Sequence, residues 1–335
     1  MYTVKTPFDA CLEAILTAHT IESEINAAKK LAQIYEQLLQ QIVKDEQYQD
    51  TNPTHIDGGV ALSSRHALDC LDDPLRTVRF IAGAYAALQD TLNTIKERPL
   101  QVVYAGCGPG APLLLPFLHE FDKDQIDITL LDLNTTSLQS VKALIDHLDL
   151  HAYFRGFELV DAVTYEHPKN LGLHFVISET MDKGFTREPQ VRVTQNMVAQ
   201  LHPDGMFIPE AIDLYTEHTF YGKEPYFDIY KKHADLPPVY STIDRALLFT
   251  IDKHVHNDPP FEFESEPLKV PEDYSQTPDV AVFAEVRIYK DYILEKSESL
   301  LSNPVCILSL NNVSSSHYIL KHTTQGTPDW ELIQV

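Results

Sequence analysis

The sequence predicts an α/β protein with N-terminal helices, a doubly wound parallel sheet and a C-terminal antiparallel, β-barrel-like domain. From Leu100 onward, short apolar runs alternate with helical stretches, a pattern typical of strands that pair in parallel. After Pro209 the helical signal fades, and strand-like runs follow one another between proline-rich turns. A chain of 335 residues is also too long for one core of ordinary size. We therefore expect three regions, at residues 1–98, 99–209 and 210–335.

The first region is expected to be helical on both sides of a loop. Between residues 8 and 48, apolar side chains recur at steps of three and four residues, as on one face of a helix. This stripe needs a partner surface, either on the same chain or on a second subunit. The segment QDTNPTHIDGG then marks a loop through its Asn-Pro and Gly-Gly pairs, and a second helical stretch is expected from Leu75 to Ile95.

The second and third regions differ in the order of their expected elements. In the second region we expect strands in the runs QVVYAG, ITLLDL, YFRGFELV, HFVISE and GMFIPE, with helical stretches after the first, second and fourth. In the third region the strand-like runs are IDLYTEHTFY, RALLFTI, VAVFAEVRIY, VCILSL and HYILKH. Turns such as DLPPVY and HNDPPFEF separate these runs, which indicates antiparallel pairing.

Charge and composition exclude several classes of partner. The chain has 26 basic and 49 acidic side chains, a formal net charge of -23, which repels nucleic-acid backbones and permits a cationic substrate. No apolar run approaches the roughly 18 residues that a membrane span needs, and the N-terminus lacks a secretory pattern. The cysteines are scattered without a CxxC pair, which suits a reducing compartment. We therefore expect a cytoplasmic chain that binds neither nucleic acid nor membrane.

A glycine-rich turn, VVYAGCGPGAP, follows the first strand of the second region. Gly106, Gly108 and Gly110 let the backbone turn sharply and approach a ligand closely. Gly106, Gly108 and Ala111 also fit the GxGxxA form of dinucleotide-binding turns, so a nicotinamide cofactor has to be weighed. The two prolines of this turn lack the N–H groups that a pyrophosphate requires. The turn therefore favours a ligand without phosphates, such as S-adenosylmethionine.

Acidic residues at later strand ends are further candidates for the same site. Asp132 ends the run ITLLD about 20 residues beyond the last glycine, and suits the carboxylate that accepts hydrogen bonds from ribose hydroxyls. Asp161, in FELVDAV, is a candidate for contact with the adenine edge. Glu179 and Glu188 flank a loop after HFVIS, so both are expected at the edge of the sheet where doubly wound folds bind ligands.

Two carboxylates in a partly dry cleft repel each other unless a cation lies between them. A guanidinium is planar, permanently charged and able to donate to two carboxylates. A metal ion is the competing occupant, but Asp182 is the only other candidate ligand near the two glutamates. His254 and His256 form an HxH pair that lacks a third ligand nearby. The pattern therefore favours a guanidinium, and we expect no metal site.

Four segments, in this order, resemble class I S-adenosylmethionine-dependent methyltransferases, and specifically the protein arginine methyltransferase family: VVYAGCGPG, LLDLN, VISETMDKGFTRE and LHPDGMFIPEAIDLY. The resemblance covers roughly residues 65 to 305. In that family two glutamates nine residues apart hold the substrate guanidinium, a role that falls here on Glu179 and Glu188. The segment LDDPLRT is similar to a family motif whose arginine contacts the cofactor's carboxylate, a role that falls on Arg76.

The resemblance implies a Rossmann-like methyltransferase domain followed by a β-barrel-like domain, with S-adenosyl-L-methionine as cofactor, and a homodimer. The substrate side departs from the family pattern. Thr180 and Asp182 replace an aromatic residue and a glycine, and the family's Thr-His-Trp turn is not found after LLSNP. His317 and Trp330 are the nearest residues of those types, and neither fits the motif.

We therefore expect an N-methyltransferase that acts on a guanidino nitrogen, with free arginine or a related small molecule favoured over a peptidyl arginine. A protein arginine N-methyltransferase is the alternative within the same class. A non-catalytic cofactor-binding partner or regulator is the alternative of another class, and retention of both glutamates counts against it. A nicotinamide-dependent oxidoreductase comes third, because of the prolines in the glycine turn.

Overall fold

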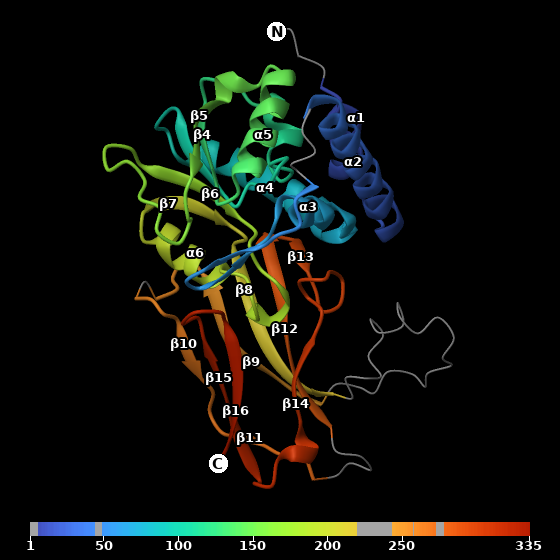
Figure 1. Cartoon of the computed structure of the whole chain (residues 1–335), viewed down its shortest axis with the longest axis vertical. Coiled ribbons are helices and arrows are strands. Elements are labelled where there is room, and N and C mark those ends of the chain that lie inside the picture. The colour runs from blue at the N-terminus through green and yellow to red at the C-terminus, as the bar shows by residue number, and fades with distance from the viewer. Residues whose placement is uncertain (1–5, 44–48, 220–242, 257, 273–277) are drawn as a thin grey trace.

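The structure is a computed structural model that describes residues 6–43, 49–219, 243–256, 258–272 and 278–335. Figure 1 shows the helices and the parallel sheet in its upper half and the antiparallel strands in its lower half. Some expected segments lie wholly or partly outside the described residues. These are the end of the helical stretch 8–48, the end of IDLYTEHTFY, the turn DLPPVY and one residue of HNDPPFEF. No helix of the described part is long and apolar enough to cross a membrane.

The N-terminal region is helical, as predicted, with one small hairpin. Its elements in chain order are α1 (Asp9–Leu16), α2 (Ile21–Ile42), β1 (Thr54–Ile56), β2 (Gly59–Ala61), α3 (Ser64–Asp69), the 3-10 helix η2 (Cys70–Asp72) and α4 (Pro74–Thr94). The stretch predicted as one helix is divided in two, because the Thr20 side chain caps a new helix by accepting a hydrogen bond from the Ser23 N–H group.

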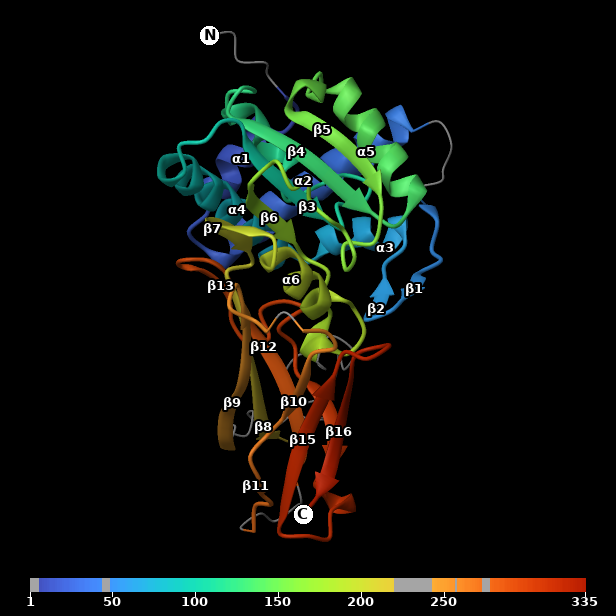
Figure 2. The same cartoon turned by 90° about the vertical axis from the view of Figure 1, so that its left-hand side faces the viewer.

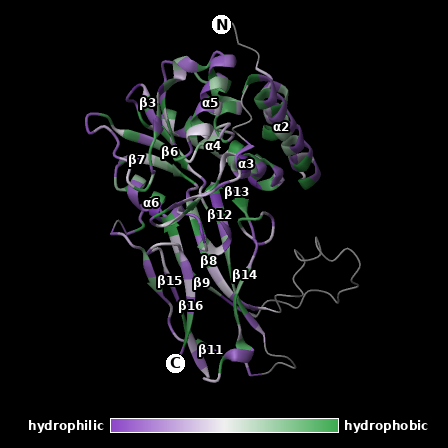
Figure 3. Cartoon of the chain, in the orientation of Figure 1, coloured by the Kyte–Doolittle hydropathy of each residue, from purple (hydrophilic) through white to green (hydrophobic). Residues whose placement is uncertain are grey.

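Apolar and polar residues alternate around α2 (Figure 3), and its buried residues include Leu31, Tyr35 and Leu39. They pack against α1, α4 and α5 of the same chain. The apolar stripe that the sequence left without a partner therefore finds one within the chain.

The central sheet is parallel and doubly wound, which confirms the predicted fold class. Its strands are β3 (Leu100–Ala105), β4 (Ile126–Asp132), β5 (Phe154–Leu159), β6 (Leu173–Ser178) and β7 (Leu201–Ile208). They lie in the order β5-β4-β3-β6-β7, and every neighbouring pair is parallel. The direction of winding reverses between β3 and β6, so the segments that follow these two strands border the crevice where such sheets bind ligands.

Helices cover both faces of this sheet (Figure 2). Helix α5 (Thr135–His147) follows β4, and α6 (Gln190–Val198) follows β6. Successive residues of β3 alternate between two cores: Val102 and Tyr104 face α2, α4 and α5, whereas Val103 and Ala105 face α6. Burial on both faces explains why the inner strands β3 and β6 read as nearly continuous apolar runs.

The expected helix after the glycine turn is instead a 3-10 helix, η3 (Leu115–Glu120). Pro116 falls inside the expected helical run PLLLPFLHEF, where it supplies no N–H group to continue an α-helix and disfavours α-helical geometry in the residue before it. No α-helix therefore begins at the glycine turn.

The C-terminal strands are antiparallel, as predicted, and form two hydrogen-bonded sheets. One contains β8 (Ala211–Thr219), β9 (Ile243–Asp252), β12 (Asp279–Tyr289), β13 (Tyr292–Leu294) and β14 (Val305–Ser309). The other contains β10 (Glu262–Glu264), β11 (Leu268–Lys269), β15 (His317–Thr323) and β16 (Asp329–Gln334). Phe249 of the first sheet stacks on Trp330 of the second, with ring centroids 6.1 Å apart, so the sheets enclose a shared aromatic core.

Helix α4 joins the two halves of the molecule. Arg79 of α4 forms ion pairs with Glu24 of α2 and with Glu298, which follows β13, and donates to the Ile293 carbonyl oxygen at 2.7 Å. Asp73, just before α4, accepts hydrogen bonds from the Ser299 hydroxyl at 2.7 Å and from a neighbouring N–H group. Because α4 packs against both halves, a division into three domains remains a prediction.

Candidate functional site

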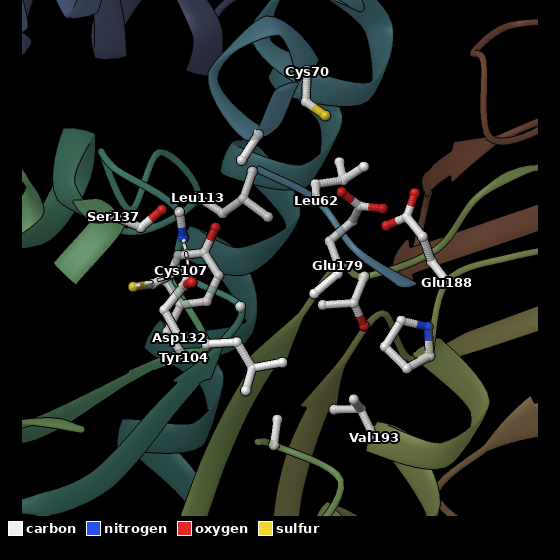
Figure 4. A pocket seen from close by; sticks show the side chains of 18 of the residues that line it. Leu62, Cys70, Tyr104, Cys107, Leu113, Asp132, Ser137, Glu179, Glu188 and Val193 are labelled. Atoms are coloured by element: carbon white, nitrogen blue, oxygen red, sulfur yellow. Dashed lines mark hydrogen bonds between the residues drawn. The ribbon is translucent and has the colours of Figure 1, made fainter. Parts of the chain in front are cut away.

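A cavity lies at the carboxyl edge of the parallel sheet, where β3 and β6 end (Figure 4). The empty space within it, including space open to solvent, is about 970 Å³. The structure places seven of the eight predicted site residues on its wall: Arg76, Gly106, Gly108, Asp132, Asp161, Glu179 and Glu188. These seven residues, which lie between positions 76 and 188 of the sequence, thus converge on one space because the sheet aligns its strand ends.

The first two glycines of the turn are required by its backbone geometry. Gly106 and Gly108 have φ values of 71° and 60°, in the left-handed region that side chains with a Cβ rarely adopt. A Cβ atom at Gly106 would also lie 2.6 Å from the Thr180 side chain. Gly110 differs, because a Cβ there would lie 2.8 Å from the ring of Tyr35 in α2. The structure therefore gives Gly110 a packing position against α2 and does not bring it to the cavity.

Asp132 is fixed beside the glycine turn. Its Oδ2 atom accepts a hydrogen bond from the Gly108 N–H group at 2.8 Å, and its Oδ1 atom accepts one from the Asn134 N–H group at 2.8 Å. Burial raises the pKa of Asp132 to about 6, and these N–H groups act in the opposite direction. Asp161 also lines the cavity, and its Oδ1 atom accepts a hydrogen bond from the Val163 N–H group at 2.8 Å.

The two glutamates lie at the other end of the cavity, away from Asp132, and their carboxylates point toward each other (Figure 4). Glu179 follows β6, and Glu188 precedes α6. The Glu179 side chain is only 3% exposed, and its Oε2 atom forms an ion pair with Nη2 of Arg76. Its Oε1 atom is buried and has no hydrogen-bond partner among the described residues. A buried carboxylate oxygen without a donor marks a place where a ligand N–H group is favoured.

The pKa of Glu188 is raised well above the usual value of a glutamate. Burial and the nearby charge of Asp182 raise its pKa to about 7, whereas Arg76 and Arg187 act in the opposite direction. Arg76 thus interacts with both glutamates, and its side chain is 13% exposed. Its predicted contact with a cofactor carboxylate remains a prediction, because the structure pairs it with Glu179 instead.

The loop between the glutamates is organised by Asp182, one of the departures from the family pattern. Its Oδ1 atom accepts hydrogen bonds from the N–H groups of Thr186 and Arg187 at 3.0 Å and of Glu188 at 3.4 Å. A glycine could not supply these acceptors. The other departure, Thr180, donates its N–H group to the Gln190 side chain at 2.8 Å. Gln190 is fully buried and was not predicted, since a glutamine at a helix start carries no distinctive sequence signal.

The last hairpin of the described chain supports this loop from the antiparallel half. Trp330 Nε1 donates to the Gly184 carbonyl oxygen at 2.7 Å, and His322 Nε2 donates to the Phe185 carbonyl oxygen at 3.0 Å. His317, the histidine that the sequence analysis considered, lies at the other end of β15 and forms a hydrogen bond with the Ser316 hydroxyl. His322 was missed because its closeness to the loop depends on how β15 pairs with β16.

The histidines of the HxH pair lie apart from the cavity lining. The His254 N–H group donates to Asp252, and His256 is exposed beside Asp258. Within the part of the chain that the structure describes, no three His, Cys, Asp or Glu side chains are arranged to hold a metal ion.

No protein-family model matches the chain, and no curated protein matches it either. Among solved structures, it is similar to a Trypanosoma brucei PRMT1 enzyme-prozyme heterotetrameric complex with AdoHcy, with 12% identity and a TM-score of 0.49. That match covers 79% of this chain and 96% of the other. It is also similar to Arabidopsis thaliana protein arginine methyltransferase 10 in a uniquely open conformation, with 10% identity and a TM-score of 0.48. This second match covers 80% of this chain and 96% of the other.

Both names belong to the family that the sequence motifs resemble.

Proposed function

We propose that this protein is an S-adenosylmethionine-dependent N-methyltransferase that acts on a guanidino nitrogen. The observation that carries the proposal is the state of Glu179. This carboxylate is almost fully buried, pairs one oxygen with the guanidinium of Arg76, and has no donor for its other oxygen among the described residues. Glu188 lines the same cavity. Two converging carboxylates match the N–H groups of a planar cation.

The opposite end of the cavity supports S-adenosylmethionine as the cofactor. Asp132 and Asp161 would accept hydrogen bonds from its ribose and adenine groups. A pyrophosphate cofactor fits less well, because the Gly108 N–H group already donates to Asp132 and no α-helix begins at the glycine turn. When bound, S-adenosylmethionine supplies a methyl group on a positively charged sulfur, which keeps the bonding electron pair as the methyl group leaves.

The two glutamates would bind and orient the substrate. A guanidinium nitrogen is a poor nucleophile because its lone pair is delocalised over the group. Hydrogen bonds from two of its nitrogens to Glu179 and Glu188 would hold positive charge there and leave electron density on the attacking nitrogen. Correct positioning of this kind can contribute about 7–11 kcal/mol to lowering a barrier.

Glu188 would also accept the proton that the reaction releases. The new N–C bond makes the methylated nitrogen acidic, so the proton leaves after the transfer and no strong base is needed before it. A carboxylate with a pKa of about 7 is well matched to that step near neutral pH.

We propose free arginine or another small guanidino compound as the substrate, in preference to a protein arginine. The support is the hairpin of β1 and β2, from which Ile56 and Ala61 line the cavity. The Val60 N–H group donates to the Arg187 carbonyl oxygen at 2.9 Å, and the Gly58 N–H group donates to the Gly326 carbonyl oxygen at 2.7 Å. The hairpin therefore lies against the glutamate loop, where a bound polypeptide would compete with it for space.

The decisive experiment replaces Glu179 by Gln. We expect Glu179→Gln to lower methyl transfer by about 100-fold or more while leaving calorimetric affinity for S-adenosylmethionine nearly unchanged, because the carboxylate acts on the substrate. Glu158→Gln, at an exposed position of β5, serves as the control with the same chemical change. Unchanged methyl transfer, or a loss explained by weaker cofactor binding, would contradict the assigned role.

Substrate choice is tested by mass spectrometry after parallel incubation with arginine, agmatine and arginine-rich peptides. Preferential methylation of the peptides would favour a protein arginine methyltransferase. Cofactor binding without transfer to any of them would favour a non-catalytic partner. The resemblance further leads us to propose a cytoplasmic homodimer, and light scattering of the purified protein measures its oligomeric state.

A further inference from the structure

The backbone of the loop that carries Glu188 forms hydrogen bonds with two separate parts of the chain. Asp182, within the loop, accepts hydrogen bonds from the N–H groups of residues 186–188. The carbonyl oxygens of Gly184 and Phe185 point the other way and accept hydrogen bonds from Trp330 and His322. Since buried backbone groups need partners, the loop depends on both sources for its conformation.

The two anchoring side chains form a rigid pair. His322 and Trp330 lie directly opposite each other where β15 pairs with β16, and their ring centroids are 4.7 Å apart. Both are buried, with exposed fractions of 2% and 8%. Phe249 stacks on Trp330 within the aromatic core of the antiparallel half. Packing on all sides leaves these rings little freedom, so their donors present a fixed template to the loop.

His322 is suited to donate a hydrogen bond in its neutral form. Burial lowers its pKa, although the Phe185 carbonyl oxygen acts in the opposite direction. Its Nε2 atom faces that carbonyl and therefore carries the proton. The Nδ1 atom is buried and has no hydrogen-bond partner among the described residues. An apolar ring would be enough to fill the core at these two positions. His322 and Trp330 each also donate an N–H group to the loop, so they do more than fill space.

We propose that His322 and Trp330 are positioning residues of the site, which fix residues 182–188 so that Glu188 faces Glu179 across the substrate position. This inference rests on the proposed function, because it assigns a role in the same guanidino methyl transfer. Neither residue touches the cavity. They act through the loop backbone, and a displacement of about 1 Å in such a group can cost on the order of 100-fold in rate.

The test compares variants that keep an aromatic ring but lack the N–H donor with one variant that restores a donor. Trp330→Phe and His322→Phe each delete one N–H donor, whereas His322→Gln keeps an N–H donor at a similar reach. Tyr318→Phe is the matched control, because it removes a buried hydrogen bond of 2.7 Å to His218 from the same strand, β15, away from the loop. Each variant is measured for kcat and KM toward the guanidino substrate, cofactor affinity and thermal midpoint.

We expect Trp330→Phe and His322→Phe to lower kcat/KM for the guanidino substrate by about 10- to 100-fold, with cofactor affinity changed less than about threefold. His322→Gln should recover most of that loss, and Tyr318→Phe should stay close to the parent protein. Unchanged turnover in the donor-deletion variants, or an equal loss in Tyr318→Phe, would overturn the proposal.

A second measurement separates this inference from the proposed function. Hydrogen exchange of the peptide spanning residues 182–188, followed by mass spectrometry, reports the loop without any need for turnover. Faster exchange in Trp330→Phe than in Tyr318→Phe supports anchoring of the loop even if the parent protein methylates no guanidino compound, in which case only the proposed function fails. Equal exchange in the two variants overturns the anchoring itself.

Discussion

The ionisation of Glu188 is expected to set how the activity of the site depends on pH. Its pKa is raised to about 7 by burial and by Asp182. The ionised carboxylate holds a guanidinium far more strongly than the protonated acid does, so kcat/KM is expected to rise with pH through about 7. Asp182→Asn removes a neighbouring negative charge while keeping an oxygen acceptor for the loop. Ionisation of Glu188 then becomes easier, and the acid limb should move to lower pH.

The measurement is a pH profile of kcat/KM for the parent protein, Asp182→Asn and Glu188→Gln. The limb near pH 7 should disappear in Glu188→Gln, although its activity will be low. A limb that stays at the same pH in both variants would assign the titration to another group, of which Asp132, with a pKa of about 6, is the nearest in value.

Single residues show how far a motif can be trusted. The spacing of Glu179 and Glu188 predicted two carboxylates in one cavity, and the structure places both there. Gly110 belongs to the same motif as Gly106 and Gly108, yet it packs against Tyr35. A glycine is needed wherever the backbone is closely approached, whether by a ligand or by a neighbouring helix. Sequence alone does not distinguish these causes, because Tyr35 lies in a distant part of the chain.

At the scale of elements, the glutamate loop depends on the fit of Gly184 against the antiparallel half. Gly184 has a φ of 64°, and a Cβ atom there would lie 2.7 Å from Val305 and 3.0 Å from Val282. We expect Gly184→Ala to reduce the free energy of unfolding by roughly 2–4 kcal/mol, through backbone strain and crowding together. Because the crowding pushes on the loop, methyl transfer should fall as well.

Gly326→Ala provides the control for Gly184→Ala. Gly326 has a similar φ of 71°, but a Cβ atom there meets no heavy atom within 4 Å. Denaturation by urea and methyl-transfer assays on both variants separate strain from crowding. Equal losses of stability in the two variants would show that contact with Val282 and Val305 contributes nothing.

Elements were predictable where burial leaves a simple pattern. Strands β3, β4 and β6 are buried along almost their whole length, so their apolar runs were read correctly. The segment after the glycine turn was also rich in apolar residues and was expected to be helical. Because Pro116 interrupts it, the structure contains only the 3-10 helix η3 there. The support of the loop by His322 and Trp330 could not be predicted, because it depends on a hairpin and a loop separated by 137 and 146 residues.

At the scale of the whole molecule, Arg79 holds the helical region, α4 and the antiparallel half together. Its side chain is 15% exposed, and its partners Glu24 and Glu298 are 14% and 24% exposed. Arg79→Ala leaves two partly buried carboxylates without their cation. We expect a loss of roughly 3 kcal/mol in the free energy of unfolding, measured by urea denaturation.

Arg155→Ala is the comparison for Arg79→Ala. Arg155 pairs with Asp127 at the edge of the parallel sheet, where the arginine side chain is 43% exposed, so its removal should cost less than about 1 kcal/mol. If both variants lost equal stability, the contact between the two halves would contribute no more than an ordinary surface ion pair.

The two antiparallel sheets were less predictable than the parallel one. The sequence indicated antiparallel strands in the third region, and the structure contains them. It did not indicate which strands pair. Strand β8 pairs on one side with β9, the next strand along the chain, and on the other side with the more distant β12. Such choices depend on contacts between distant segments, which local patterns do not encode.

The position of the loop anchors along the chain has a consequence for protein synthesis. Glu179 and the glycine turn are translated long before Trp330, which lies 146 residues beyond its partner Gly184. A growing chain can therefore assemble the parallel sheet and the cofactor end of the cavity while the glutamate loop still lacks its anchors. The substrate end is completed only after the last hairpin has emerged from the ribosome and folded against it.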